Sequence, residues 1–283
     1  MLTFSIILPT YNRGYIIWKT IQSVQKQIYP HWELLIIDDG STDNTEQVVA
    51  QFQKDPRISY KKIQNAGVAN ARNIGFKKAQ GDIIVYLDSD DTLYENFLTT
   101  LVEFLKRNPH AVFGISNYNR RIECYDEHYQ LLDFKESTSF QKETITLQDI
   151  YHWQIKTTST GLFHTREAKK TIKWNTEITR FEDWDFLMQL GEKYPQGFLH
   201  IPYVLFQYRE RYGTDSLCST STYSDWADSF EKIYQKHKNS PCMQGQDWYP
   251  AKVNKYKERQ ELFEKGKFPS PAYKNFPEYF KKK

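Results

Sequence analysis

Acidic side chains gather in the segment 88–91, where their type and spacing suit a metal ion. Asp88, Asp90 and Asp91 directly follow an apolar run, and the first two form an Asp-Ser-Asp motif. Repulsion among carboxylates this close raises their pKa values unless a cation relieves it. Mg²⁺ or Mn²⁺ suits the position because such an ion takes one or two protein carboxylates and completes its shell with substrate phosphates. Acidic residues also cap helices, so the segment by itself is consistent with a helix start too.

Two further acidic segments have side chains able to take part in chemistry. Asp38 and Asp39 end another apolar run, and the residues after them are also typical of a turn before a helix. Asp183 stands at the start of an amphipathic stretch. Acidic residues in a first helical turn favour the helix dipole, which by itself explains a carboxylate at this position.

The elements that must position these residues follow the pattern of β-α-β units on a parallel sheet, because short apolar runs alternate with longer amphipathic ones. The predicted strands are Phe4–Leu8, Glu33–Asp38, Arg57–Ile63 and Asp82–Leu87, and the predicted helices are 14–27, a helix opening near Asp43, Val68–Ala79 and 93–108. Ligands of an open parallel sheet bind beyond the carboxyl ends of its strands. The segments 9–13, 38–43 and 88–91 are therefore expected along one edge.

The pattern weakens in the second half of the chain. We predict strands at Ala111–Ser116, Thr157–His164 and Gly197–Tyr208, and helices at Glu182–Lys193, Tyr223–His237 and Ala251–Lys265. Residues 121–144 are polar and aromatic and allow no assignment. Pro269, Pro271 and Pro277 predict an irregular end to the sequence.

Composition bounds the class of protein. A chain of 283 residues can hold one large α/β domain, with or without a smaller appendage. Cys124, Cys218 and Cys242 lack the spacing of a zinc site or a disulfide framework, which fits a reducing compartment. A net charge of +3 and the absence of a known nucleic-acid motif argue against nucleic acid as a partner. The sequence has neither a signal-peptide pattern nor an apolar run of membrane-span length, so we expect a cytoplasmic protein.

Taken in order, these motifs resemble the family 2 glycosyltransferases, inverting enzymes of the GT-A fold that include many of the bacterial surface-glycan type. The residues that carry the resemblance are 5–13, 35–43, 65–75, 81–91 and 181–185, and the match spans about residues 3–215. It implies an α/β fold with a mostly parallel, Rossmann-like sheet flanked by helices. We expect a GT-A domain at 1–215, with a nucleotide-sugar half at 1–110 and an acceptor half at 111–215. A helical and irregular extension then occupies 216–283.

The resemblance also implies a donor site for a nucleotide-diphosphate sugar, with UDP as the expected nucleotide. Thr10 and Tyr11 would lie against the nucleotide, and Asp39 would bind its base. Arg72 would hold the nucleotide, and Asp88 would approach the ribose. The remaining predicted donor residues are Pro9, Arg13, Gly67, Ser89 and Arg211.

For the metal, the resemblance makes Asp90 the ligand of a Mn²⁺ or Mg²⁺ ion that bridges the diphosphate. Many relatives place a histidine where this sequence has Arg211. Arginine cannot ligate a cation but forms paired hydrogen bonds with phosphate, so a metal here would depend on Asp90 and the diphosphate. Arg211 is alternatively a strand end at the surface.

For the reaction, Asp183 matches the general base of the family. It would take a proton from an acceptor hydroxyl that attacks the anomeric carbon opposite the departing nucleotide diphosphate. Glu182 and Trp184 are predicted to contact the acceptor, although Trp184 is equally consistent with core packing. The expected enzyme is a hexosyl- or N-acetylhexosaminyltransferase that extends a glycan or a lipid-linked oligosaccharide in cell-surface polysaccharide biosynthesis.

The basic end of the chain suggests where the protein is located. From Lys252 to Lys283 there are ten Lys and Arg against four Glu, interspersed with aromatic residues. Such a mixture suits the anionic inner face of a membrane, so we expect peripheral contact there. A solvated terminal helix followed by a loosely packed segment explains the same composition.

Two other functions fit parts of the sequence. A nucleotidyltransferase also uses a parallel sheet and acidic metal sites, but its glycine-rich phosphate loop is absent from residues 9–13. A noncatalytic module that retains the fold is the second alternative. The presence of Asp39, Asp90 and Asp183 argues against it.

Overall fold

The computed structural model describes residues 1–126, 128–140, 143–153, 155, 157–212, 221–243 and 248–267. The chain forms two compact units. The first unit comprises Met1–Asn119, Thr138–Thr176 and Glu182–Tyr208, and the second comprises Arg120–Ser137, Glu177–Phe181 and Arg209–Lys283. The division into donor and acceptor halves stays a prediction, since the units are defined by compactness and not by function.

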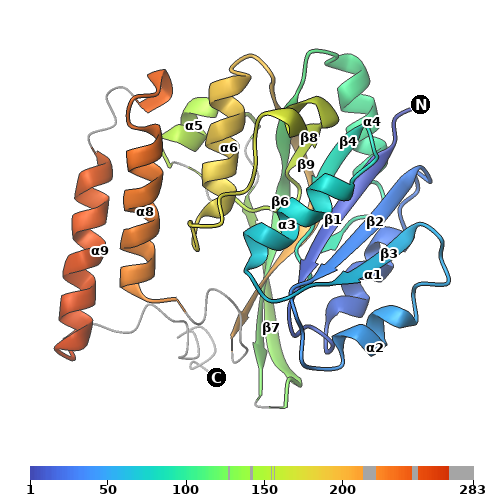
Figure 1. Ribbon diagram of the computed structural model, residues 1–283, viewed down its shortest axis with the longest axis horizontal. Coiled ribbons are helices and arrows are strands. Elements are labelled where there is room, and N and C mark those ends of the chain that lie inside the picture. Colours follow the sequence, from blue (N-terminus) through green and yellow to red (C-terminus); the bar gives the residue numbers. More distant parts are fainter. Residues whose placement is uncertain are drawn as a thin grey trace. The chain divides into compact units, whose positions relative to one another are not determined.

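The first part of the chain forms the predicted β-α-β units (Figure 1). In chain order the elements are β1 (Phe4–Thr10), α1 (Ile17–Gln25), β2 (Trp32–Asp38), α2 (Thr45–Ala50), β3 (Ile58–Lys62), α3 (Val68–Lys78) and β4 (Ile83–Tyr86). β1 pairs in parallel with both β2 and β4, and β2 pairs in parallel with β3. The carboxyl ends of these strands therefore lie along one edge, as expected for a binding site.

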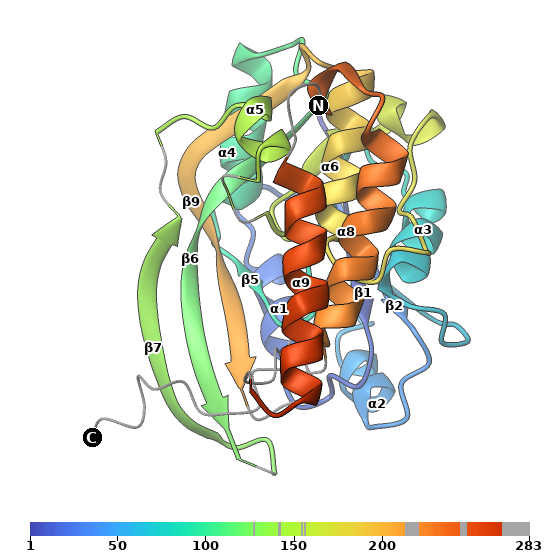
Figure 2. The ribbon, with the colours of Figure 1, turned by 90° about the vertical axis from the view of Figure 1, so that its left-hand side faces the viewer.

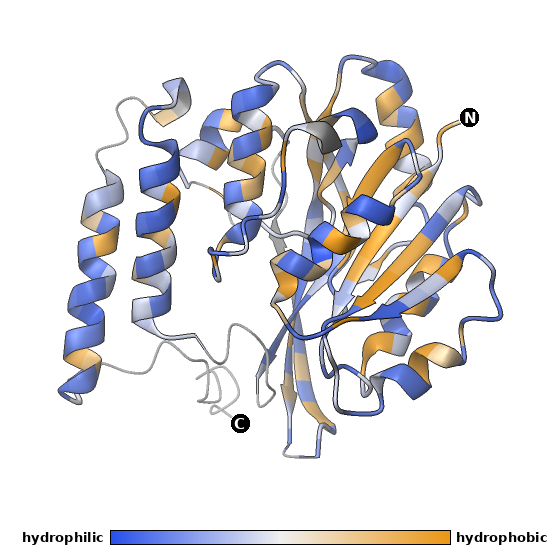
Figure 3. Cartoon of the chain, viewed as in Figure 1, coloured by the Kyte–Doolittle hydropathy of each residue, from blue (hydrophilic) through white to orange (hydrophobic). Residues whose placement is uncertain are grey.

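Burial explains why these strands appear in the sequence as continuous apolar runs. All seven residues of β1 and all four of β4 are buried, and Figure 3 shows their hydrophobic character. A parallel strand covered on both faces has no alternating polar side. α3 packs against β1 and β2, and Gly75 allows its close approach, because a Cβ there would lie 2.6 Å from Ile7 Cγ2.

The rest of the sheet contains antiparallel pairs, so the sheet as a whole is mixed. Its further elements are β5 (Thr92–Leu93), α4 (Phe97–Arg107), β6 (Phe113–Tyr125), α5 (Leu147–Tyr151), β8 (Phe163–Thr165), the 3₁₀ helix η1 (Arg166–Lys170), α6 (Glu182–Lys193) and β9 (Phe198–Tyr212). The strand order is β3-β2-β1-β4-β8-β6-β9-β5. β8 runs antiparallel to both β4 and β6, and β5 runs antiparallel to β9. Only the end of the strand predicted at 157–164 is present, as the start of β8. Residues 157–162 lie outside any strand.

The second unit contains the ends of β6 and β9, the start of β7 (Leu131–Phe140), and the helices α8 (Tyr223–His237) and α9 (Trp248–Glu264). β7 pairs with β6, so 121–125 and 131–140, which the sequence left unassigned, belong to strands. α8 and α9 pack side by side (Figures 1 and 2) through aromatic side chains that include Trp226, Phe230 and Tyr256. Both predicted helices are present, and a capping box of Thr222 and Asp225 begins α8. The prolines at 269, 271 and 277 lie outside the described residues.

Among the helices of the described residues, none combines the length and the apolar composition needed to cross a bilayer.

Candidate active site

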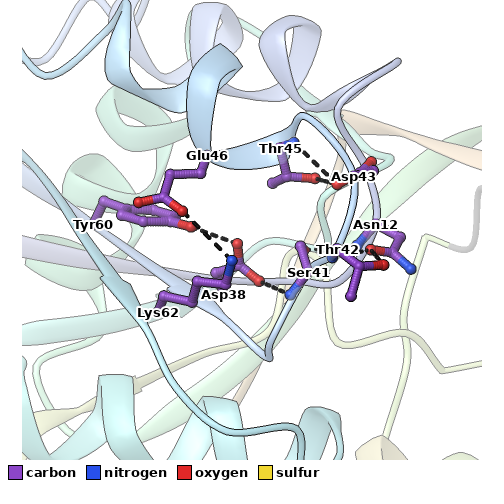
Figure 4. Close-up of polar contacts among 9 residues, drawn as sticks. All are labelled: Asn12, Asp38, Ser41, Thr42, Asp43, Thr45, Glu46, Tyr60 and Lys62. Carbon is purple, nitrogen blue, oxygen red and sulfur yellow. Dashed lines mark hydrogen bonds and ion pairs between the residues drawn. The ribbon is translucent and has the colours of Figure 1, made fainter.

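The loops that follow β1 and β2, here called the N-terminal loops (residues 11–16 and 39–44), are bonded to each other (Figure 4). The backbone N–H of Asn12 donates to Ser41 Oγ at 2.8 Å, and Asn12 Oδ1 accepts the N–H of Thr42 at 2.8 Å. Asn12 has a φ of 51°, a left-handed conformation that asparagine tolerates better than most residues. The two loops therefore hold each other through paired bonds between side chains and backbone.

Asp43 extends the same contact. Its Oδ2 accepts the N–H of Gly14 at 2.9 Å, while its Oδ1 accepts the N–H of Thr45 at 3.0 Å. Thr45 Oγ1 in turn accepts the N–H of Arg13 at 2.9 Å. Arg13 directs its guanidinium to the carbonyls of Tyr11 and Asn12, at 3.1 and 3.0 Å.

Beneath the loops, Asp38 is fully buried at the end of β2. Its carboxylate accepts the N–H of Ser41 at 2.7 Å and the hydroxyl of Tyr60, on β3, at 2.5 Å (Figure 4). Burial and this bond raise the pKa of the Tyr60 phenol above its usual range. Asp38 therefore supports the loop from inside the sheet and is not available to a ligand.

Asp39 faces the other way, toward the start of α3. Its two carboxylate oxygens accept the N–H groups of Ala66 and Gly67, at 2.9 and 2.8 Å. Burial raises the pKa of Asp39, and the two backbone bonds oppose that shift. Gly67 stands at a φ of 90° and begins α3. Each carboxylate oxygen can accept a second hydrogen bond, so the predicted contact with a nucleotide base is compatible with this arrangement.

The end of β1 lies between these groups. Thr10 accepts the N–H of Asp39 on its carbonyl at 2.8 Å, and within the described residues its buried hydroxyl has no hydrogen-bond partner. Pro9 is also buried, whereas Tyr11 is 44% exposed. A nucleotide bound at this edge would meet the Tyr11 ring first.

A second group of charged residues, here called the carboxylate cluster (Asp88, Asp91, Glu182 and Asp183), is assembled around Arg72 of α3. Arg72 Nη1 bonds Glu182 at 2.8 Å, and its Nη2 bonds Asp88 at 2.8 Å. The guanidinium carbon also lies 4.4 Å from the centre of the Trp174 ring. Arg72 is 2% exposed and bonds protein carboxylates through both terminal nitrogens, so a direct contact with the nucleotide stays a prediction.

Asp183 lies on the second residue of α6, half-buried and next to Glu182. Removal from water, followed by repulsion from Glu182, raises the pKa of Asp183 to about 6. A hydrogen bond from Thr157, the charge of Arg72 and the N–H of Trp184 act in the opposite direction. A carboxylate with this pKa is a better proton acceptor at neutral pH than an ordinary aspartate, and it remains largely ionised.

The predicted metal ligand, Asp90, is half-buried, and its neighbour Ser89 is buried. Arg72 pairs with both Asp88 and Glu182, and Asp91 accepts a hydrogen bond from Thr160, so a single buried guanidinium lies among the four carboxylates of the cluster. No group of three or more His, Cys, Asp or Glu in the described ranges is arranged to hold a metal. Asp90 fits Mg²⁺ or Mn²⁺ as a single carboxylate whose metal takes its other oxygens from a diphosphate.

Two predicted acceptor residues have other partners. Trp184 is completely buried, and its indole N–H donates to the carbonyl of Ile150 at 2.8 Å. An indole without an exposed face is inconsistent with stacking on an acceptor sugar. Trp184 is buried because it lies on the side of α6 that packs into the core. Glu182 is 8% exposed and engaged by Arg72.

Arg211 belongs to the second unit, on β9, where it is buried. Residues 213–216 of its motif lie outside the described residues. Its predicted role toward a diphosphate therefore stays a prediction.

Sequence reasoning missed three residues of this site: Thr157, Ser159 and Thr160. None belongs to a recognisable motif. A run of hydroxyl residues before a strand is the single signal that was available, and it is common in loops.

This arrangement defines an α/β protein of the GT-A type, with acidic groups gathered at the carboxyl edge of a parallel sheet. Residues 5–171 match the family described as Glycosyl transferase family 2. The match covers more than half of the chain, so the chain belongs to this family, and the resemblance seen in the sequence is confirmed.

Among curated relatives, glycosyltransferase GlyG of Streptococcus pneumoniae is 27% identical over 249 residues, which cover 84% of this chain and 80% of GlyG. The Escherichia coli enzyme WfgD, named as a UDP-Glc:α-D-GlcNAc-diphosphoundecaprenol β-1,3-glucosyltransferase, is 43% identical over 115 residues, covering 40% of this chain and 45% of WfgD. Several other relatives are much longer, and the chain spans 19% of their length.

Solved structures show the same fold. S. aureus TarS 1–349 in complex with UDP-GlcNAc aligns with a TM-score of 0.69 at 20% identity, over 93% of this chain and 73% of the 1–349 fragment. The mannosyltransferase PcManGT of Pyrobaculum calidifontis, in complex with GDP-Man and Mn²⁺, aligns with a TM-score of 0.61 at 15% identity, over 96% of this chain and 77% of PcManGT. The predicted fold class is therefore confirmed.

Proposed function

We propose that this chain transfers a sugar, with inversion, from a nucleotide-diphosphate donor to an acceptor hydroxyl, and that Asp183 is its general base. The observation that carries the proposal is the position of Asp183 beside the Arg72-centred cluster, with its pKa raised to about 6. An inverting displacement needs one base near the acceptor and stabilisation of charge on the leaving group. Asp183 meets the first requirement, since its pKa lies close to physiological pH.

The donor side is supported by the N-terminal loops and by what relatives bind. We propose a UDP-sugar, in line with the UDP-GlcNAc complex of TarS and the UDP-Glc in the name of WfgD. Tyr11 and Asp39 would receive the nucleoside, and Asp88 would approach the ribose.

The leaving diphosphate needs positive charge at the carboxyl edge of the sheet. A Mn²⁺ or Mg²⁺ ion held by Asp90 would supply it when bound, as the Mn²⁺ complex of PcManGT illustrates for this fold. Asp90 would fix the ion, and Arg72 would keep Asp88 oriented beside it.

For the acceptor we propose a glycan or lipid-linked oligosaccharide of cell-surface polysaccharide biosynthesis. WfgD is named for an undecaprenyl-diphosphate-linked substrate. Peripheral contact with the inner face of the membrane would bring the protein to such an acceptor, and Lys255, Lys257, Lys265 and Lys267 are exposed on or just after α9. Flotation with anionic vesicles, before and after deletion of residues 252–283, tests that contact.

The central test compares Asp183→Asn with the wild type in a transfer assay with a panel of UDP-sugars and lipid-linked acceptors, with and without Mn²⁺. Because a general base contributes about 10²- to 10⁴-fold, we expect transfer to fall by that factor while donor binding changes little. Glu192→Gln, which removes an exposed carboxylate from the same helix, is the matched control. Equal transfer by Asp183→Asn and wild type would exclude the proposed base.

A further inference from the structure

Four consecutive hydroxyl residues, Thr157-Thr158-Ser159-Thr160, immediately precede the turn into β8, and we call them the hydroxyl segment. Two of them, Ser159 and Thr160, donate a hydrogen bond to a carboxylate of the cluster. No known motif gives these residues a role, but their contacts with the carboxylate cluster indicate a role.

Ser159 connects the two sides of the cluster. Its hydroxyl accepts a hydrogen bond from Arg72 Nη2 at 2.7 Å and donates one to Asp88 Oδ2 at 2.6 Å. Ser159 is 3% exposed. Arg72 and Ser159 therefore bind different oxygens of the Asp88 carboxylate, which leaves it little freedom to rotate.

Thr160 fixes the backbone next to this carboxylate. Its hydroxyl donates to Asp91 Oδ2 at 2.6 Å and accepts the backbone N–H of Asp88 at 3.0 Å. Both Thr160 and Asp91 are buried. A single hydroxyl thus sets the turn that presents residues 88–91.

Thr157 affects the other part of the cluster, because its side chain lowers the pKa of Asp183 against the effect of burial. The segment of four residues therefore acts on the loop after β4 through Ser159 and Thr160, and on the first turn of α6 through Thr157. These two elements are about a hundred residues apart in the sequence.

The antiparallel register of β8 explains how the segment comes to lie there. Val85 of β4 pairs with Phe163 of β8, so the chain before β8 runs beside the chain after β4. Tyr86 continues the ladder, since its N–H donates to Leu162 O at 3.1 Å and its carbonyl accepts the N–H of Gly161 at 3.3 Å. Gly161 has a φ of 80°, and a Cβ there would lie 2.4 Å from the Phe206 ring, so this turn requires glycine.

We propose that the hydroxyl segment is the positioning element of the active site: Ser159 orients Asp88, the carboxylate that faces the donor, Thr160 fixes the turn that presents it, and Thr157 acts on the general base. This inference rests on the proposed function, because it assigns roles relative to the base and the donor. Hydroxyls suit the task, since each donates one hydrogen bond with a fixed direction and still accepts others. A carboxylate held by directed bonds needs no reorganisation when the substrates arrive.

The first experiment replaces Thr157 by valine, which keeps the shape of the side chain and removes the hydroxyl. We expect kcat to fall and the acidic limb of the pH profile of kcat/KM to move to higher pH, because the Thr157 side chain favours the ionised form of Asp183. The charges that face Asp183 from α6 and α3, Glu182 and Arg72, are unchanged in this variant.

Two further variants show whether the effect of Thr157→Val comes from the loss of the Thr157 hydroxyl. Thr157→Ser keeps the hydroxyl and should restore both the rate and the pH profile. Thr158→Val is the matched control, because Thr158 is a half-buried neighbour whose hydroxyl makes no hydrogen bond within the described residues. It should behave as the wild type.

The second experiment replaces Ser159 by alanine and measures donor and acceptor kinetics separately. We expect the KM for the UDP-sugar to rise about tenfold and kcat to change less, because Asp88 faces the donor and not the base. Melting temperatures of all variants identify any loss of folding. If Ser159→Ala does not fold, the half-buried Thr157 series decides the question.

The outcomes separate this inference from the proposed function. If Asp183→Asn retains full transfer, the proposed function fails. If Asp183→Asn loses transfer while Thr157→Val and Ser159→Ala match Thr158→Val, the proposed function stands and the positioning role is overturned.

Discussion

The N-terminal loops and the carboxylate cluster lie at the carboxyl ends of neighbouring strands but are held by different chemistry. In the loops, side chains bond backbone N–H groups of an adjacent loop about thirty residues away, as Asn12 does with Ser41 and Thr42. In the cluster, a buried guanidinium and two hydroxyls bond carboxylates, and the partners lie up to 110 positions apart.

This difference has a consequence for stability and for reactivity. The carboxylates of the loops accept backbone N–H groups, and for Asp39 these bonds oppose the rise in pKa that burial causes. Asp183 in the cluster is desolvated and is also repelled by Glu182, and its pKa rises to about 6. Carboxylates that accept backbone N–H groups can build a rigid binding surface. A general base needs a carboxylate whose pKa is raised by desolvation and a neighbouring charge.

The largest effect on this comparison should come from Arg72→Met, which removes the charge at the centre of the cluster. We expect the free energy of unfolding to fall by about 3–5 kcal/mol, because Asp88 and Glu182 lose their buried partner. Urea unfolding measures it. Arg57→Met is a matched control: Arg57 also bonds an aspartate at 2.8 Å and lies over a tryptophan ring, but its side chain is 38% exposed against 3% for Arg72. It should cost about 1 kcal/mol, and equal losses would mean that burial does not distinguish the two pairs.

Asp183→Asn in the carboxylate cluster and Asp43→Asn in the N-terminal loops should change the stability of the protein in opposite directions. The folded protein holds the Asp183 proton more tightly than the unfolded chain, so wild-type stability declines as pH rises from about 4 to about 6. Above pH 6 the variant should be more stable than the wild type, by no more than about 3 kcal/mol, since one pKa unit corresponds to about 1.4 kcal/mol.

Asp43→Asn gives the opposite expectation for the N-terminal loops. Its carboxylate accepts three hydrogen bonds, from the N–H groups of Gly14 and Thr45 and the hydroxyl of Thr45. An amide replaces one acceptor oxygen by a donor, so this variant should be less stable at neutral pH. Unfolding curves between pH 4 and pH 8 measure both variants. A stabilising Asp43→Asn would contradict the distinction drawn between the regions.

Tyr60→Phe tests the support beneath the loops. It removes the hydroxyl that donates to the buried Asp38 carboxylate, and we expect a loss of about 1–2 kcal/mol. Tyr203→Phe is the control, because Tyr203 is 57% exposed and its hydroxyl forms no hydrogen bond within the part of the chain described. Thermal unfolding of both variants is sufficient, and no difference between them would show that Asp38 does not depend on Tyr60.

The smallest expected effect concerns the backbone at Asn12. Both Asn12→Gly and Asn12→Ala lose the bond to Thr42, but alanine must also adopt the left-handed conformation at a φ of 51°. Alanine should therefore be less stable than glycine by about 1 kcal/mol. Equal stabilities would indicate that the loop relaxes and that its conformation is not imposed by its neighbour.

Much of the first region could be predicted from the sequence. The apolar runs of β1, β2 and β4 and the polar residues after them indicate a parallel sheet with a polar edge, because a doubly covered strand is apolar throughout. The positions of Asp39, Asp88 and Asp183 in motifs allowed their expected roles to be stated in advance. Trp184 shows the limit of this reasoning, since nothing in its neighbourhood separates a core indole from one that faces a sugar.

What the sequence determined by itself is local: which segments become strands, where each strand ends, and which acidic residues stand at those ends. The tertiary structure alone decided which of those residues share partners. A strand pattern carries no register with a distant strand, and the antiparallel pairing of β8 with β4 is what sets Ser159 against Asp88. The electrostatics of the site depends on that pairing and on burial, because desolvation and neighbouring charge are properties of position in the fold and not of residue type.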